Sequence, residues 1–128
     1  MSWNILIVDD SMVVRAVVHK ALKLADIPIG ELHQAGDGQE ALAILENNRV
    51  DLIFSDLMMP VMDGEEFLNV LHDKGLIDEI PVVVISSAVG TERMIRLQRL
   101  GAKGFIHKPF TPEQIGEVVN KVMGVNAS

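Results

Sequence analysis

Short apolar runs alternate with longer segments of mixed polarity along this chain. Three of the runs are rich in branched residues and too short for helices: Asn4–Val8, Asp51–Phe54 and Pro81–Ser86. Two weaker runs of the same kind are Glu31–Ala35 and Gly104–Lys108. Apolarity that is continuous rather than alternating is typical of strands buried on both faces, as in a parallel sheet. The pattern therefore predicts five parallel strands.

A helix is predicted after each strand. Ser11 is suited to cap a helix that runs to about Ala25, and its apolar residues have the spacing of one helical face: Val14, Val17, Val18, Ala21 and Leu22. The other four helices are predicted to begin at turn or capping residues: Asp37-Gly38, Gly64, Thr91 and Thr111-Pro112. Each connection is long enough for a helix, so the chain is predicted to be a (βα)5 doubly wound α/β domain.

The predicted topology brings polar residues to one edge of the sheet. A flavodoxin-like five-stranded parallel sheet of order 2-1-3-4-5, with helices on both faces, binds ligands beyond the carboxyl ends of its strands. The polar residues at the ends of strands 1, 3, 4 and 5 are Asp9 and Asp10, Asp56, Ser86 and Ser87, and Lys108. Strand 2 lies at the edge of such a sheet, so Asp37 is predicted to be only a turn and capping residue.

Composition narrows the class of protein. The chain has 128 residues, 48% of them hydrophobic and 23% charged, which suits one globular domain. No apolar run approaches the roughly 18 residues that span a bilayer, so we expect a cytoplasmic protein with no membrane contact. The absence of cysteine excludes thiol catalysis and thiolate zinc sites. A net charge of −7 argues against nucleic acid as a partner, and no two of the four histidines have ligand spacing.

Three converging carboxylates predict a cation site. At an effective dielectric near 20, each pair about 5 Å apart is destabilised by roughly 3 kcal/mol, and Lys108 supplies only one positive charge. Oxygen ligands without soft donors suit Mg²⁺. An aspartate can attack phosphorus to form an acyl phosphate, and Asp56 is the best nucleophile candidate because it lies between the acidic pair and Lys108. Asp9 and Asp10 are the better metal ligands.

Five segments occur in order along nearly the whole chain: ILIVDDS, AGDGQEAL, DLIFSDLMMPVMDG, PVVVISS and GAKGFIHKPF. With these segments the chain resembles the receiver domain of two-component response regulators, and most closely the single-domain receivers of chemotaxis. The resemblance implies a receiver domain over residues 1–124, a short tail over residues 125–128 and no output domain. It also implies a phosphorylation-activated switch rather than a turnover enzyme, catalysing only its own phosphorylation and slow dephosphorylation.

The resemblance assigns roles to the residues of the site. Asp56 would accept a phosphoryl group from a phosphohistidine on a sensor histidine kinase of the chemotaxis type, or on a phosphotransfer protein. One Mg²⁺ would be bound directly by Asp10, Asp56 and the backbone carbonyl of Met58, and by Asp9 mainly through water. Ser86 would be the switch hydroxyl. Lys108 would contact a phosphoryl oxygen, and its peptide bond to Pro109 would be cis.

The chain departs from the chemotaxis receivers at three positions. Phe105 stands at the aromatic switch position where those receivers have tyrosine, so a hydroxyl contact with a target is lost. Met58 and Ala88 replace polar and acidic residues on the route of water to the phosphoryl group, which is expected to alter self-dephosphorylation. For the side chains of Met58, Met59 and Met62, core filling is the favoured interpretation.

A basic surface is predicted on the fourth helix. Arg93, Arg96 and Arg99 recur every three residues and Lys103 follows, so they form either a solvated face or a docking patch for an acidic segment. We expect output by binding a downstream protein in trans through helix 4, strand 5 and helix 5, in chemotaxis or motility. The alternatives are a stand-alone phosphorelay receiver with a non-motility partner and an excised receiver of a larger regulator. A monomer is expected, with a phosphorylation-dependent dimer as the alternative.

Three other functions stay open at this level. An aspartate-nucleophile phosphatase needs a second acid two residues after the nucleophile, where this chain has Met58. A flavin-binding module needs a hydroxyl- and glycine-rich phosphate loop after strand 1, where this chain has Asp9 and Asp10. If the protein were a phosphorylation-independent scaffold, the acidic residues and Lys108 at the strand ends would have no role in its function.

Overall fold

The computed structural model describes residues 2–87 and 89–124, in which five strands and five helices alternate as predicted. The strands are β1 (Trp3–Val8), β2 (Ile29–Ala35), β3 (Leu52–Ser55), β4 (Val82–Ser86) and β5 (Gly104–His107). The helices are α1 (Met12–Leu24), α2 (Gly38–Asn47), α3 (Gly64–Asp73), α4 (Thr91–Leu100) and α5 (Pro112–Met123). Within the described residues, none of these helices is long and apolar enough to cross a bilayer. Ala88 and the predicted tail lie outside the described residues.

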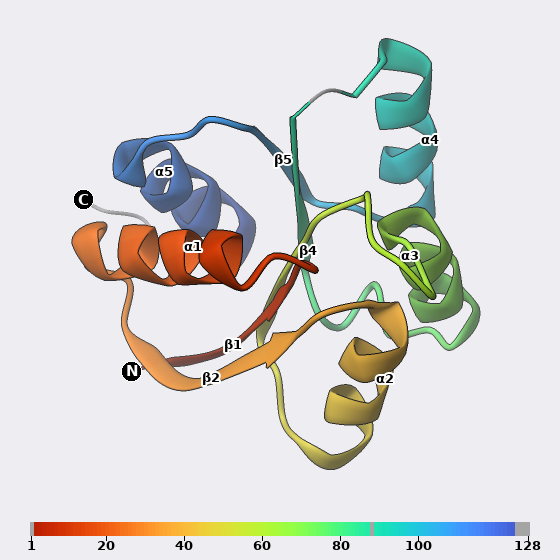
Figure 1. Ribbon diagram of the computed structural model, residues 1–128, viewed down its shortest axis with the longest axis horizontal. Helices are drawn as coiled ribbons and strands as arrows, with labels where there is room; N and C mark the ends of the chain where they lie inside the picture. The colour runs from red at the N-terminus through yellow and green to blue at the C-terminus, as the bar shows by residue number, and fades with distance from the viewer. Residues whose placement is uncertain (1, 88, 125–128) are drawn as a thin grey trace.

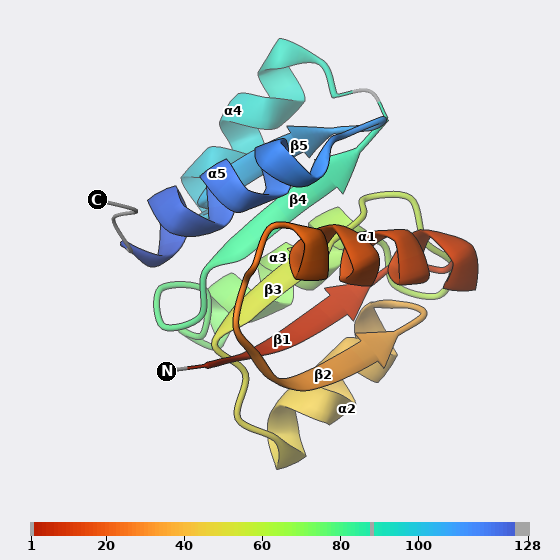
Figure 2. The same ribbon diagram turned by 90° about the vertical axis from the view of Figure 1, so that its left-hand side faces the viewer.

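The strands form one parallel sheet in the order β2-β1-β3-β4-β5, which confirms the predicted order. The arrowheads in Figure 2 all point to the same edge of the sheet. The chain leaves β1 toward the α1 and α5 face and β3 toward the other, so the carboxyl ends of these neighbouring strands are the topological switch point, where open α/β sheets bind ligands. This is the edge to which the sequence assigns the polar residues.

Two apolar clusters cover the two faces of the sheet. In β1, Ile5 and Ile7 join the cluster beneath α1 and α5, whereas Leu6 and Val8 join the cluster beneath α2, α3 and α4. Figure 1 shows the same division, with α1 and α5 on one side of the sheet and α3 and α4 on the other. All four side chains are buried, which explains why the run is apolar at every position instead of alternating.

Three of the predicted helix caps are present, whereas Thr91 is the first residue of α4, whose N-cap is Gly90 without a side-chain hydrogen bond. The side chains of Ser11, Asp37 and Thr111 accept hydrogen bonds from backbone N–H groups in the first turns of α1, α2 and α5. Asp63 caps α3 in the same way. One prediction is wrong, because Val17 is 50% exposed. Only Val18, Ala21 and Leu22 of α1 are buried, so the face of this helix toward the core is narrower than its apolar spacing indicates.

Candidate functional site

Three carboxylates converge at the carboxyl ends of β1 and β3. Asp9 and Asp10 follow β1, Asp56 follows β3, and the pairing of Val8 with Ser55 places the two strand ends level. Each aspartate has a carboxylate oxygen within 4.8 Å of one from each of the others. Asp9 and Asp56 are buried, whereas Asp10 is exposed. The topology therefore brings residues 47 positions apart into one cluster that opens to solvent on the Asp10 side.

Lys108 joins this cluster from the end of β5. Its ammonium nitrogen lies 3.2 Å from Oδ2 of Asp9 and 3.5 Å from Oδ2 of Asp56. Its backbone N–H donates to the carbonyl of Ser86, and its peptide bond to Pro109 is cis. The lysine thus bridges the two buried carboxylates and leaves Asp10 on the open side.

Backbone N–H groups fix the orientation of the two buried carboxylates. The N–H of Leu57 donates to Oδ1 of Asp56 at 2.8 Å, and the N–H of Ser11 donates to Oδ1 of Asp9 at 2.9 Å. In each aspartate one oxygen is held by its own loop while the other faces Lys108. This arrangement pre-organises both side chains, because neither has to find its orientation when a ligand arrives.

The charges and donors of the site fit a divalent cation. Three ionised carboxylates and one ammonium leave two uncompensated negative charges. At separations near 5 Å and an effective dielectric near 20, each carboxylate pair is destabilised by about 3 kcal/mol. The donors are oxygen atoms only, which favours a hard cation such as Mg²⁺ over zinc or copper. The acidic cluster can therefore bind a metal ion.

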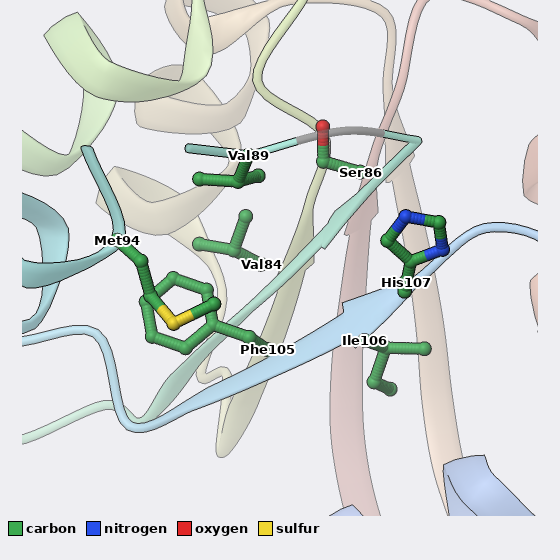
Figure 3. Close-up of a pocket in the computed structure, with 7 residues that line it drawn as sticks. All are labelled: Val84, Ser86, Val89, Met94, Phe105, Ile106 and His107. Atoms are coloured by element: carbon green, nitrogen blue, oxygen red, sulfur yellow. The ribbon is translucent and has the colours of Figure 1, made fainter. Parts of the chain in front are cut away.

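Ser86 and Phe105 lie at the two ends of a pocket beside the acidic cluster. The pocket has a volume of about 50 Å³ between β4, β5 and the start of α4. Figure 3 shows the Phe105 ring against Met94 at one end and the Ser86 side chain near Val89 at the other. The serine is buried, and the ring is partly buried against the core. Ser86 and Phe105 therefore line the same pocket.

The three methionines after Asp56 have different environments. The side chain of Met58 is 69% exposed, so the core-filling interpretation is wrong for this residue. Met59 and Met62 pack against the core, as predicted. The exposure of Met58 follows from its position in the loop over the acidic cluster, where its backbone lies two residues from Asp56 while its side chain extends into solvent.

Sequence reasoning missed a contribution of Arg15. Its guanidinium group donates to the backbone carbonyl of Asp9 and, at 3.0 Å, to the side chain of Gln34. The arginine on α1 thereby ties the loop after β1 to β2. Its position one helical turn after Ser11 places it over this loop, which is the signal that the sequence offers.

The predicted basic surface on α4 is partly used within the molecule. Arg93 and Arg96 form ion pairs with Glu65 in the first turn of α3, at 3.2 Å and 3.1 Å. Arg99 and Lys103 are exposed. Ile95 is 42% exposed, which agrees with the sequence pattern, because α4 has more apolar residues than one narrow stripe can bury.

The pairing of Glu65 predicts a pH-dependent contribution to stability. Hydrogen bonding from Arg96 is the largest cause that lowers the pKa of Glu65, followed by Arg93, while burial opposes the shift. A lowered folded-state pKa means that the stabilisation is complete above the ordinary value near 4.3 and is lost as the pH falls through the folded-state value. We expect Glu65→Gln to reduce the free energy of unfolding by up to about 1 kcal/mol at pH 7.

Urea denaturation at a series of pH values from 7 to 3 measures this effect. The difference between the wild type and Glu65→Gln should shrink toward zero at the acid end. A difference that stays constant across the series would show that it does not come from the charge of Glu65.

Fold and site together define the class of this protein as a flavodoxin-like α/β domain with a cluster of three carboxylates at its topological switch point. The family model for the response regulator receiver domain matches residues 5–120, and the chain belongs to this family. Its members are signalling switches and not classical enzymes.

Individual relatives are similar over nearly the whole chain. The chemotaxis protein CheY-3 of Vibrio cholerae is 31% identical over 94% of this chain and 92% of its own. The structure of V. cholerae CheY4 has a TM-score of 0.83 at 33% identity, covering 95% of this chain and 99% of that one. The phosphorylated cyanobacterial phytochrome response regulator RcpA has a TM-score of 0.82 at 25% identity, covering 99% and 98%.

Proposed function

We propose that this protein is a phosphorylation-activated switch in which Asp56 accepts a phosphoryl group from a phosphohistidine of a sensor kinase or a phosphotransfer protein. The observation that carries the proposal is the fixed carboxylate of Asp56, buried between two further carboxylates and 3.5 Å from the Lys108 ammonium. A nucleophile, a cation and a metal-binding acidic pair are the groups that a transferring phosphoryl group needs.

The transfer is a substitution at phosphorus. A carboxylate oxygen of Asp56 forms the new O–P bond as the N–P bond of the phosphohistidine breaks, and the leaving imidazole nitrogen takes a proton from solvent. Lys108 neutralises a phosphoryl oxygen, and the Ser86 hydroxyl donates a hydrogen bond to another. The exposed Asp10 side leaves the approach to Asp56 open for a donor protein.

The residues that would hold Mg²⁺ are Asp10, Asp56 and the backbone carbonyl of Met58, with Asp9 contributing mainly through water. The bound ion would supply positive charge to the phosphoryl oxygens and balance the two negative charges left by Lys108. The oxygen-only donor set of the described cluster supports this assignment.

The proposed output is a change of the α4-β5-α5 surface that alters binding of a protein target in trans. The added phosphoryl group has a charge of roughly −1.5 to −2, and Ser86, Phe105 and the intervening pocket would carry the rearrangement to α4 and β5. The chemotaxis relatives favour a role in motility. A stand-alone phosphorelay receiver for a different target is the second candidate, because RcpA, a phytochrome response regulator, is also similar over nearly the whole chain.

The same proposal includes a cytoplasmic monomer whose receiver domain spans residues 1–124. Phosphorylation-dependent dimerisation is the alternative. Gel filtration of the protein before and after addition of beryllofluoride, which mimics an acyl phosphate, distinguishes the two.

Incubation with acetyl phosphate tests the proposed reaction and its dependence on metal. In the presence of Mg²⁺ we expect intact-mass spectrometry to show one added phosphoryl group per chain, and none when EDTA replaces the metal, because the three carboxylates then repel the incoming phosphate. Equal incorporation with and without Mg²⁺ would contradict the metal assignment. Sustained release of phosphate from p-nitrophenyl phosphate would instead favour a phosphatase.

A further inference from the structure

One carboxylate of α3 holds two arginines of the neighbouring helix α4. Oε1 of Glu65 accepts from Nε of Arg93 at 3.2 Å and from Nη2 of Arg96 at 3.1 Å, while Oε2 accepts from Nε of Arg96 at 3.1 Å. Both oxygens are therefore engaged, and the contact with Arg96 is the two-bond fork that guanidinium groups form with carboxylates. Arg93 and Arg96, here called the arginine pair, form a site for one carboxylate.

This site is an accessible one. The side chains of Glu65, Arg93 and Arg96 are 25%, 32% and 56% exposed, so a carboxylate from outside can approach the guanidinium groups. The exposed Arg99 lies one helical turn beyond Arg96, and the exposed Ile95 lies one turn before Arg99, about 100° around the helix from Arg96. An acidic segment thus finds the arginine pair and Arg99 along one side of α4, with the apolar contact of Ile95 next to Arg99.

α4 is one of two helices with an excess of positive charge; the other is α1, which has Arg15, Lys20 and Lys23 and no acid. Helix α4 contains one acid, Glu92, and three arginines, a balance of +2 in a protein of net charge −7. Glu92 lies one turn before Arg96 and adds a further attraction for its guanidinium. The positive charge of α4 attracts an acidic segment, and the carboxylate geometry of the arginine pair distinguishes this helix from α1.

Glu65 links the arginine pair on α4 to the acidic cluster of Asp9, Asp10 and Asp56. It directly follows Gly64, whose backbone N–H donates to the carbonyl of Leu57 at 2.9 Å. Leu57 in turn donates to the side chain of Asp56. Figure 1 shows α3 and α4 beside each other on the same side of the sheet, with the first turn of α3 next to the loop after β3. A shift in that loop is therefore able to move the carboxylate that occupies the arginine pair.

We propose that the arginine pair binds a carboxylate-bearing segment of a partner protein and that Glu65 is an internal competitor for the same site. The inference rests on the docking role proposed for α4 and does not depend on phosphoryl transfer. When the Glu65 carboxylate is hydrogen-bonded to both arginines, the partner binds weakly. When Glu65 moves away, the same hydrogen bonds are free for the partner.

The expected effect is modest because the competing ion pair is partly exposed. Exposed pairs change an equilibrium by roughly two- to five-fold, and a competitor lowers the apparent affinity by the fraction of sites that it leaves free. Removing the Glu65 carboxylate should therefore raise the affinity for an acidic segment by about two- to five-fold.

Fluorescence anisotropy with the unphosphorylated protein tests the competition. The probe is a fluorescein-labelled peptide of alternating leucine and glutamate, titrated with the wild type, Glu65→Gln and the matched control Glu66→Gln. The control removes the same charge one residue away, from an exposed side chain of the same helix. Circular dichroism verifies that each variant is folded.

We expect tighter binding only for Glu65→Gln, and we expect the gain to disappear in Glu65→Gln combined with Arg96→Gln. Equal affinities of the two single variants would overturn the proposal, because the gain would then reflect net charge alone. Absence of peptide binding by every variant, or tighter binding of a labelled single-stranded DNA than of the peptide, would also overturn it. Because no phosphate donor is present, a failure here leaves the phosphoacceptor role of Asp56 untouched, and failure of that role does not affect this test.

Discussion

The Asp56→Asn variant is expected to take up no phosphoryl group from acetyl phosphate while remaining folded. Asparagine keeps the oxygen that accepts from the Leu57 N–H, so the loop retains its hydrogen bond. The amide nitrogen that replaces the other carboxylate oxygen is not a nucleophile at neutral pH. The substitution also removes one charge from a cluster in which the carboxylates repel one another. Intact-mass spectrometry of both proteins after the same incubation measures the loss.

The matched control for this experiment is Asp37→Asn. Asp37 also follows a strand, but its side chain caps α2, and asparagine caps a helix as well as aspartate does. Incorporation by the control should equal that of the wild type. If the Asp56 variant still gained one phosphoryl group, a different residue would have to be the acceptor, and the proposed function would fail at its central point.

Gly64→Ala is expected to reduce the free energy of unfolding by about 3 kcal/mol. A Cβ atom at this position would lie 2.2 Å from the carbonyl oxygen of Asp56 and 2.7 Å from the Cα atom of Leu57. Both are backbone atoms, so the overlap cannot be relieved by rotating a side chain. The first turn of α3 or the loop after β3 has to move. Urea denaturation followed by circular dichroism measures the change.

The same substitution should also impair the site. The Gly64 N–H donates to the Leu57 carbonyl, and Leu57 holds the carboxylate of Asp56, so a displaced loop misaligns the phosphoacceptor. Gly90→Ala is the control, because a Cβ atom at Gly90 meets nothing within 4 Å. Gly90→Ala should reduce the free energy of unfolding by less than about 1 kcal/mol, the usual effect of a changed N-cap. A similar small effect at Gly64 would show that α3 is free to move away from Asp56.

Much of the fold was predictable because its signals are local. A run such as Ile5–Val8 is apolar at every position only when both faces of a strand are covered. Ser11 and Thr111 cap helices within three residues of themselves, so their sequence context is sufficient. The convergence of Asp9, Asp10 and Asp56 followed from the strand order, because parallel strands end at the same edge.

The errors occurred where exposure depends on distant parts of the chain. Val17 has the correct spacing for the buried face of α1, yet it is half exposed. Met58 is apolar and follows a buried strand, yet its side chain extends into solvent from the loop. In both cases the pattern gives the direction of a side chain relative to its own element and not the amount of protein that covers it.

The sequence by itself determined the strands, most helix caps and the edge of the sheet at which the acidic residues meet, since each depends on periodicity or on contacts within a few residues. The tertiary structure decided which arginines of α4 are free, because their partner Glu65 lies 28 and 31 positions away on another helix. It also decided how closely Gly64 approaches Asp56, and which carboxylate oxygens face Lys108. These distances depend on how the helices pack on the sheet, which no short stretch of sequence specifies.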